Sequence, residues 1–174
     1  YWRYPFPPDV QAALVTTANP TGHITNSDLE QSALLGHLDV MAHSHDVRYA
    51  SLETHCDNTP AVSRAYKGAV STIGPASYNC QIASDHQRQH RYHHTVTYLP
   101  GPQNVVADDA SRLQSLTHPA FASHLAQHYP QALPWRQQTL RPAMASSCQG
   151  NGSPRPKGPI RNCSISSTRS RTGS

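Results

Sequence analysis

The pattern of apolar and polar positions between residues 27 and 113 alternates between a helical period and short apolar runs. Three apolar residues recur at helical spacing: Leu34, Leu38 and Met41. They predict a helix with one apolar stripe that ends near residues 43–45. Ser27 is followed three residues later by Glu30, which is the spacing of a capping box and predicts that the helix opens there. This is the first of several elements in this part of the chain.

The later helices and strands have clear start and end signals in the sequence. The pattern predicts, in order, a buried strand at 48–56, a helix at 59–67, a helix at 74–90, a strand at 95–99, and helices that begin near residues 104 and 118. Thr59 is the expected N-cap of its helix, Pro60 suits the first helical position, and Gly68 marks the end. Strands that alternate with helices in this way predict an α/β fold, a sheet with helices packed on its faces.

The first twenty residues are less regular. Tyr4-Pro5-Phe6-Pro7-Pro8 predicts an extended piece or short strand, and residues 10–15 a weak helical turn. Asn19-Pro20 and Thr21-Gly22 indicate a turn, after which residues 23–25 are expected to end a strand. We therefore expect a partial strand or extended segment over residues 1–20.

Composition adds a second distinction, between a globular part and a tail. Hydrophobic residues make up 36% and charged residues 14%, and 15 prolines outnumber 9 glycines, so we expect one modest core. Ten acidic and six basic residues lie at or before Asp109, whereas eight basic and no acidic residues follow it. We expect residues 116–147 to form a helical or linking segment and 148–174 a disordered basic tail. A mildly acidic region followed by a basic one suits a metal site beside a polyanion.

The cysteines and the apolar runs exclude several classes of protein. The four cysteines are widely spaced without a C-x-x-C pair, which argues against a zinc knuckle and a disulfide framework and for a reduced, intracellular setting. No run approaches the length of a membrane span, and Tyr1-Trp2-Arg3 does not open a signal peptide. We expect no membrane association. Because the sequence does not begin with methionine, we also expect it to start inside a longer reading frame.

Acidic residues follow or begin the predicted elements at three places. Glu30 lies in the first turn of the first long helix, Asp57 directly after a strand, and Asp108 and Asp109 in the first turns of the helix that begins near residue 104. Strand ends and adjacent helix starts meet at one edge of an α/β sheet. Carboxylates gathered there suit Mg²⁺, or else Mn²⁺, and two such ions can hydrolyse a phosphodiester bond. The acids therefore predict metal-dependent cleavage of a nucleic-acid strand.

Three stretches resemble motifs of one family in that family's order. Residues 25–33 (TNSDLEQSA) resemble the TNxxxExxA opening of the first helix of type 1 ribonuclease H domains, and residues 56–62 (CDNTPAV) resemble the motif at its strand end. Residues 104–112 (NVVADDASR) resemble the NxxADxxSR helix of retroelement versions. The chain is thus similar, over residues 21–115, to the ribonuclease H-like domain that follows a reverse transcriptase in retrotransposon polyproteins.

The resemblance implies a fold, a site and a substrate. The fold would be a mixed sheet flanked by helices, and Glu30, Asp57 and Asp108 would be catalytic metal ligands, with Asn104 bracing the loop before the last helix. Two Mg²⁺ ions held by these residues would cut the RNA strand of an RNA–DNA hybrid. The family's first aspartate, on an opening strand before a glycine-rich hairpin, has no counterpart here. We therefore expect the first strand to lie upstream of Tyr1, next to a reverse transcriptase domain, and this chain to be an inactive fragment.

Plainer interpretations stand beside these. Glu30 would serve as a capping partner alone, and Asp108 and Asp109 would simply favour the positive end of a helix dipole. Arg88 and Arg91 lie in a cationic and aromatic patch that would touch a phosphate backbone or else face solvent. A histidine pair four residues apart within that patch would permit zinc, although no paired cysteine accompanies it. As alternatives to the enzyme, the chain would be a non-catalytic nucleic-acid-binding protein or a decayed retroelement remnant.

Overall fold

The computed structural model describes residues 1–71 and 73–141, and within them the chain has a mixed α/β architecture. The predicted tail at 148–174 and the last part of the segment at 116–147 lie outside the described residues. The elements are α1 (Pro8–Ala12), α2 (Asn26–Ser44), β1 (Ser51–Cys56), α3 (Thr59–Lys67), α4 (Pro75–His90), β2 (His93–Tyr98), the 3₁₀ turn η1 (Gly101–Gln103), α5 (Val105–Arg112) and α6 (His118–His128). None of the described helices has the length and apolar character needed to cross a membrane.

Strands β1 and β2 form a parallel pair whose register runs from Ser51 beside His93 to Cys56 beside Tyr98. In the described part of the chain the sheet consists of these two strands. The structure therefore shows the α/β class, and the mixed sheet of the ribonuclease H fold stays a prediction. Strand β1 begins at residue 51 and not at 48, because Tyr49 adopts a left-handed backbone conformation with φ of 59°.

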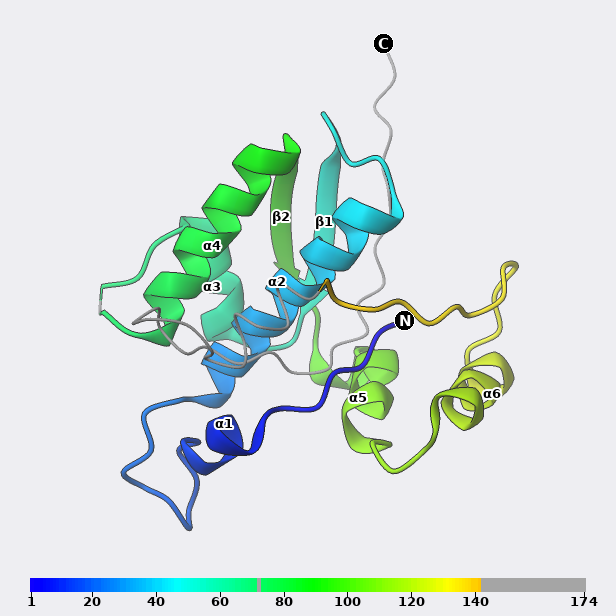
Figure 1. The fold of residues 1–174 in the computed structure, drawn as a ribbon, viewed down its shortest axis with the longest axis horizontal. Coiled ribbons are helices and arrows are strands. Elements are labelled where there is room, and N and C mark those ends of the chain that lie inside the picture. Colours follow the sequence, from blue (N-terminus) through cyan, green and yellow to red (C-terminus); the bar gives the residue numbers. More distant parts are fainter. Residues whose placement is uncertain (72, 142–174) are drawn as a thin grey trace.

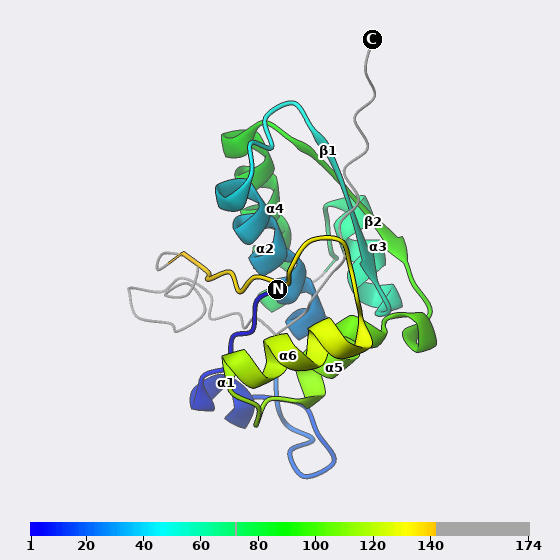
Figure 2. The same ribbon diagram turned by 90° about the vertical axis from the view of Figure 1, so that its right-hand side faces the viewer.

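One face of the strand pair is covered and the other is open. Leu52, Thr54 and Cys56 point to the covered face and are nearly inaccessible to solvent. Helices α2, α3 and α4 lie over this face, with α2 and α4 side by side (Figures 1 and 2). The residues of β1 that alternate with them, such as Glu53, are exposed or half-exposed. The sheet therefore has one core face only.

Helix α2 is enclosed on every side, which differs from the single stripe that its sequence predicts. Every residue from Gln31 to Val40 is buried. Leu34 and Leu38 pack toward the strands, whereas Ala33 and Val40 pack on the opposite side. An apolar stripe predicts which side meets the sheet, but small residues such as Ala33 let other segments approach the remaining sides. The polar residues within this stretch are thus buried too, and each needs a partner.

The capping box of α2 lies two residues earlier than Ser27 and Glu30 predict. Thr25 is the N-cap, and its side chain accepts a hydrogen bond from the backbone N–H of Asp28. The Asp28 carboxylate in turn accepts from the backbone N–H of Thr25 at 2.8 Å. Asp28 wins this role because it stands at the third helical position, where its carboxylate reaches back to the cap residue. Glu30 is therefore not the capping partner.

The boundaries of α3 and α4 lie close to those that the sequence predicts. Asn58, not Thr59, is the N-cap of α3, and its side chain accepts from the backbone N–H of Ala61 at 3.0 Å. Gly68 ends the helix with φ of 62°, as predicted. Helix α4 ends at His90, and the left-handed conformation of its C-cap residue Arg91 (φ 54°) turns the chain directly into β2. Strand β2 consequently starts at residue 93, two residues before the predicted position.

The first residues of the chain pack against its last described ones. Residues 1–7 belong to no helix or strand, and the only pairing near them within the described residues is an isolated bridge between Leu14 and Ile24. The buried Trp2 contacts α2 and α5, and the backbone N–H of Gln138 donates to the carbonyl of Tyr1 at 2.7 Å. Helices α5 and α6 lie close together at the end toward which both strands run (Figure 2).

Candidate functional site

Two of the three predicted metal ligands meet at the carboxyl end of β1. A carboxylate oxygen of Glu30, a carboxylate oxygen of Asp57 and the Sγ of Cys56 all lie within 4.8 Å of one another. Glu30 comes from the first turns of α2, and the other two from the end of β1 and the residue after it (Figure 1). A parallel strand delivers its last residues to the same edge that the start of α2 reaches. The predicted convergence of these two acids is therefore present.

The three side chains differ in their access to solvent. Cys56 is only 2% exposed, Glu30 is half-buried and Asp57 is exposed. Burial raises the pKa of the Cys56 thiol to about 11, and the nearby charges of Glu30 and Asp57 act in the same direction. The Asp57 carboxylate makes no hydrogen bond or ion pair with another residue that the structure describes. The group therefore presents a buried thiol at its base and a carboxylate at its mouth.

The turn before α5 borders this mouth. A side chain at position 101 would bring its first carbon within 3.5 Å of Oδ2 of Asp57. That separation is ordinary van der Waals contact. Gly101, in the turn that separates the strand from the last motif, therefore lies beside Asp57 at the mouth of the site.

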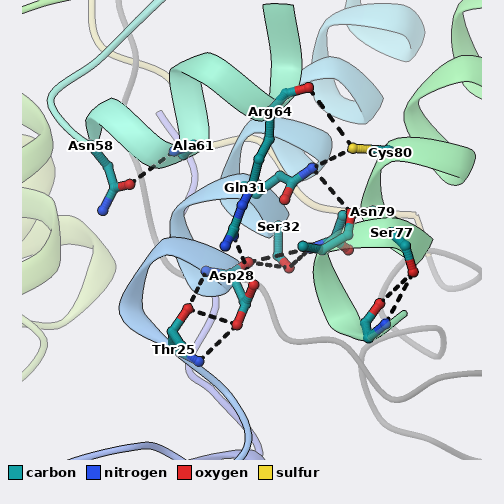
Figure 3. A network of polar contacts seen from close by, with 12 residues as sticks. Thr25, Asp28, Gln31, Ser32, Asn58, Ala61, Arg64, Ser77, Asn79 and Cys80 are labelled. Atoms are coloured by element: carbon teal, nitrogen blue, oxygen red, sulfur yellow. Dashed lines mark hydrogen bonds and ion pairs between the residues drawn. The ribbon is translucent and has the colours of Figure 1, made fainter. Parts of the chain in front are cut away.

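A polar network joins the start of α2, the helix that carries Glu30, to α3 and α4 (Figure 3). Nη1 of Arg64 on α3 donates to the nearly buried Asp28 carboxylate at 2.8 Å. The amide of Asn79 on α4 donates to the hydroxyl of Ser32 on α2 at 2.9 Å. The amide of Gln31 on α2 donates to the Sγ of Cys80 on α4 at 3.1 Å. Each of these contacts links α2 to another helix. The backbone that carries Glu30 is thereby held between α3 and α4.

Asp108 lies at the same end of the molecule but is not part of the group. Its carboxylate accepts from Nε of Arg112, one turn later on α5, at 2.7 Å. The backbone carbonyl of Asn104 accepts from the backbone N–H of Asp108, so Asn104 begins the helix that presents the aspartate. The structure thus brings Glu30 and Asp57 together, and leaves Asp108 in a local ion pair.

Asp109 has a structural role that separates it from Asp108. Its Oδ2 accepts hydrogen bonds from Nε2 of His124 and from the hydroxyl of Tyr129, each at 2.7 Å. The bond from His124 is the main reason why the pKa of Asp109 is lowered, and the bond to Asp109 raises the pKa of Tyr129 to about 12. Asp109 therefore fastens α6 to α5, while Asp108 pairs with Arg112.

The predicted cationic contacts lie at the opposite end of the sheet. Arg88, in the last turn of α4, forms an exposed ion pair with Asp85, and Nη1 of Arg91 donates to the hydroxyl of Tyr49. Both precede β2, whereas Asp57 follows the end of β1, so about seven strand residues, or roughly 20 Å, separate them. A nucleic acid that touches these arginines and the acidic group would have to span the length of the sheet.

Two features escaped the sequence analysis. Cys56 was not considered as a ligand, although its place one residue before Asp57 at a strand end was the available signal. Asp39 is completely buried in α2, where Nε of Arg141 donates to it at 2.7 Å. Burial alone would raise the pKa of Asp39, but contacts with His86 and Arg141 outweigh it and lower the pKa to about 2. An aspartate inside an apolar stretch was the signal for this pair.

The histidine pair on α4 has a packing role. The rings of His86 and His90 lie 4.3 Å apart, and Nδ1 of His86 shares a hydrogen bond with the hydroxyl of Tyr92 at 2.8 Å. Within the described residues, the one group of three or more ligand-type side chains close enough to share an ion is that of Glu30, Cys56 and Asp57. The zinc interpretation of the histidines gains no geometric support.

Comparisons of the chain with protein-family models, with curated proteins and with solved structures found no match. The arrangement itself offers two carboxylates and a thiol around a small space at a sheet edge. Oxygen donors of this kind suit a divalent cation, which would also relieve the repulsion between the two carboxylates.

Proposed function

We propose that this chain is part of a ribonuclease H-like domain of a retroelement polyprotein, and that Glu30 and Asp57 hold a divalent cation, Mg²⁺ or Mn²⁺. The observation that carries the proposal is the approach of these two carboxylates within 4.8 Å, together with Cys56. They come from the two motifs, at residues 25–33 and 56–62, that resemble the first helix and the strand end of that family. The substrate of the intact parent would be an RNA–DNA hybrid.

The donor set fits such an ion in part. Two carboxylates match the oxygen ligands that Mg²⁺ and Mn²⁺ prefer, and the exposed side of Asp57 leaves room for water and a phosphate oxygen. Asp108 is held by Arg112, and an ion would have to displace that arginine before this carboxylate could join. A further acid, on a strand beside the free edge of β1, would come from outside the described residues.

Glu30 and Asp57 would have different roles in holding the ion, because they lie at different depths in the site. A bound ion would supply Lewis-acid stabilisation of the cleaved phosphodiester. Glu30, fixed by the network around Asp28, would set the position of that ion relative to the strand end. Asp57 would share the ion from the solvent side. Because only two carboxylates are assembled, we propose that this chain binds the ion and the hybrid but does not cleave without the additional acid and its reverse transcriptase partner.

Ion binding is the first test. Mn²⁺ added to the full chain should raise its thermal stability, and Asp57→Asn should abolish that increase because it removes a charged ligand. Asp85→Asn is the matched control, since Asp85 is an exposed acid on α4 that is paired only with Arg88. An equal Mn²⁺ response in all three proteins would overturn the metal centre.

The hybrid is the second test. A labelled RNA–DNA hybrid should bind more tightly in Mg²⁺ than in chelator, and Asp57→Asn should remove the difference. Cleavage is expected only when the chain is joined to an upstream segment that supplies the additional acid, and it should be lost again in Asp57→Asn. Cleavage that persists in this variant would contradict the assigned role of Asp57.

A non-catalytic nucleic-acid-binding protein is the second candidate, and the ion pair that occupies Asp108 favours it. In that case the hybrid should bind equally well with Mg²⁺, with chelator and in Asp57→Asn, while affinity falls steeply with salt. Substitution of Arg91 by Gln should then weaken binding, because this arginine lies in the exposed cationic patch far from the acids. A dependence on both Mg²⁺ and Asp57 would exclude this candidate.

A further inference from the structure

We propose that Cys56 is a third ligand of the metal centre and that it gives the site a preference for Zn²⁺ over Mg²⁺, so that zinc acts as an inhibitor that displaces the working ion. The inference rests on the proposed metal centre at Glu30 and Asp57 and deepens it. Its basis is the position of a buried thiol within 4.8 Å of both carboxylate oxygens.

The geometry suits a small tetrahedral ion. Zinc binds thiolate sulfur at about 2.3 Å and carboxylate oxygen at about 2.0–2.2 Å, which places neighbouring ligand atoms roughly 3.3–3.8 Å apart. The three donor atoms of this group start within 4.8 Å of one another, so side-chain rotations that close them by about 1 Å are sufficient. The fourth position would face the exposed side of Asp57, where water has access.

The chemistry of the donors determines which ion is favoured. Mg²⁺ takes oxygen ligands in an octahedron and gains little from sulfur, whereas Zn²⁺ accepts a thiolate together with carboxylates. When Zn²⁺ binds, the thiol of Cys56 gives its proton to water and the ion takes its place. The buried position of Cys56 shields the resulting metal–sulfur bond from solvent, and the carboxylates balance the charge of the ion. A serine at position 56 would leave only oxygen donors, which suit ions such as Mg²⁺.

Cadmium is the probe, because its bond to a thiolate produces an ultraviolet charge-transfer band that a carboxylate does not. The full chain should carry Cys148→Ser and Cys163→Ser, so that Cys56 and Cys80 remain. Cadmium should then produce the band, Cys56→Ser should abolish it, and the matched control Cys80→Ser should retain it. Loss of the band in Cys80→Ser, or its persistence in Cys56→Ser, would overturn the proposal.

Asp57→Asn tests the same proposal without altering the core, because Asp57 is exposed. It should weaken cadmium binding about tenfold or more, the equivalent of about 1.4 kcal/mol, since the ion loses a charged ligand. An unchanged affinity would show that the thiol binds cadmium without the carboxylates, and would refute the shared site. Zn²⁺ should also displace bound Mn²⁺ from the full chain at lower concentration than Mg²⁺ does, and Cys56→Ser should narrow that difference.

The two proposals can fail separately. If Mn²⁺ binds with dependence on Asp57 but cadmium produces no thiolate band, the role of Cys56 is refuted and the metal centre stands. If neither ion binds with dependence on Asp57, the metal centre itself is refuted, and the inference about Cys56 falls with it.

Discussion

Two histidines with little access to solvent make the fold sensitive to mild acid. His37 in α2 is buried and His94 in β2 is partly buried, and the Nε2 of His37 has no hydrogen-bond partner among the described residues. Burial lowers the pKa of His37 to about 3 and that of His94 to about 4, and in His37 a charge on His94 would act in the same direction. The Nε2 of His94 shares a hydrogen bond with the hydroxyl of Thr54 at 2.8 Å. Both rings are therefore neutral in the folded state.

The sign of the effect follows from proton uptake. In the unfolded chain both histidines titrate near 6.5, so between about pH 6.5 and 4 the unfolded state binds more protons than the folded state. Stability is then fully present above 6.5 and is lost as pH falls. Each histidine contributes at most about 1.4 kcal/mol per pH unit, and the pair about 2.7 kcal/mol per pH unit. The loss expected between about pH 6.5 and 4.5 is of the order of 5 kcal/mol.

Urea unfolding followed by circular dichroism at fixed ionic strength measures this loss directly. His94→Gln should halve the slope of stability against pH. His37→Leu should do the same, and near neutral pH it should also raise stability by about 1 kcal/mol, because it removes a buried nitrogen that has no partner. A stability that stays level down to about pH 4.5, or an unchanged slope in the double variant, would refute the reasoning. The lowered pKa of Asp39 has its effect below the unfolded value near 3.9, outside this window.

Three further substitutions test particular contacts. Thr25→Ala should destabilise the chain by about 1 kcal/mol in thermal unfolding, whereas Ser27→Ala should have little effect; the reverse order would contradict the position of the cap. Asp109→Asn should cost about 1–2 kcal/mol and increase hydrogen exchange throughout α6, while Asp108→Asn should leave exchange there unchanged. Arg141→Met should cost about 1–3 kcal/mol in urea unfolding, because it leaves a buried aspartate without its main partner; an unchanged midpoint would show that Arg141 contributes nothing.

Local signals in the sequence were sufficient for most helices and strands. Gly68 ends α3 and Pro75 opens α4, because glycine alone accepts the left-handed turn easily and proline suits the first helical position. The capping box of α2 was wrong by two residues, because Thr25 and Asp28 match the pattern as well as Ser27 and Glu30 do. The burial of α2 on all sides was also missed, since a stripe of large apolar residues does not reveal what packs against alanine.

The part of the site that follows from the direction of the strands and helices was predictable from the sequence. Glu30 and Asp57 meet because the end of a strand and the start of a helix that packs on it share one edge. The position of Asp108 depends on the turn that leads into α5, and its pairing with Arg112 is a local choice that spacing alone does not decide. Cys56 was missed because it was judged by its spacing from other cysteines, not by its place beside Asp57.

The enclosure of α2 has a consequence for the order in which the chain can acquire its structure. The helix is covered by segments from both ends of the described sequence, with Trp2 on one side of it and Leu140 and Arg141 close by. Contacts between residues so distant in sequence form slowly, because a long loop must close before they contribute. During synthesis, the side of α2 that Leu140 and Arg141 cover therefore stays open until about a hundred more residues have left the ribosome. Over that interval this side of the helix is an exposed apolar surface, the kind through which nascent chains aggregate.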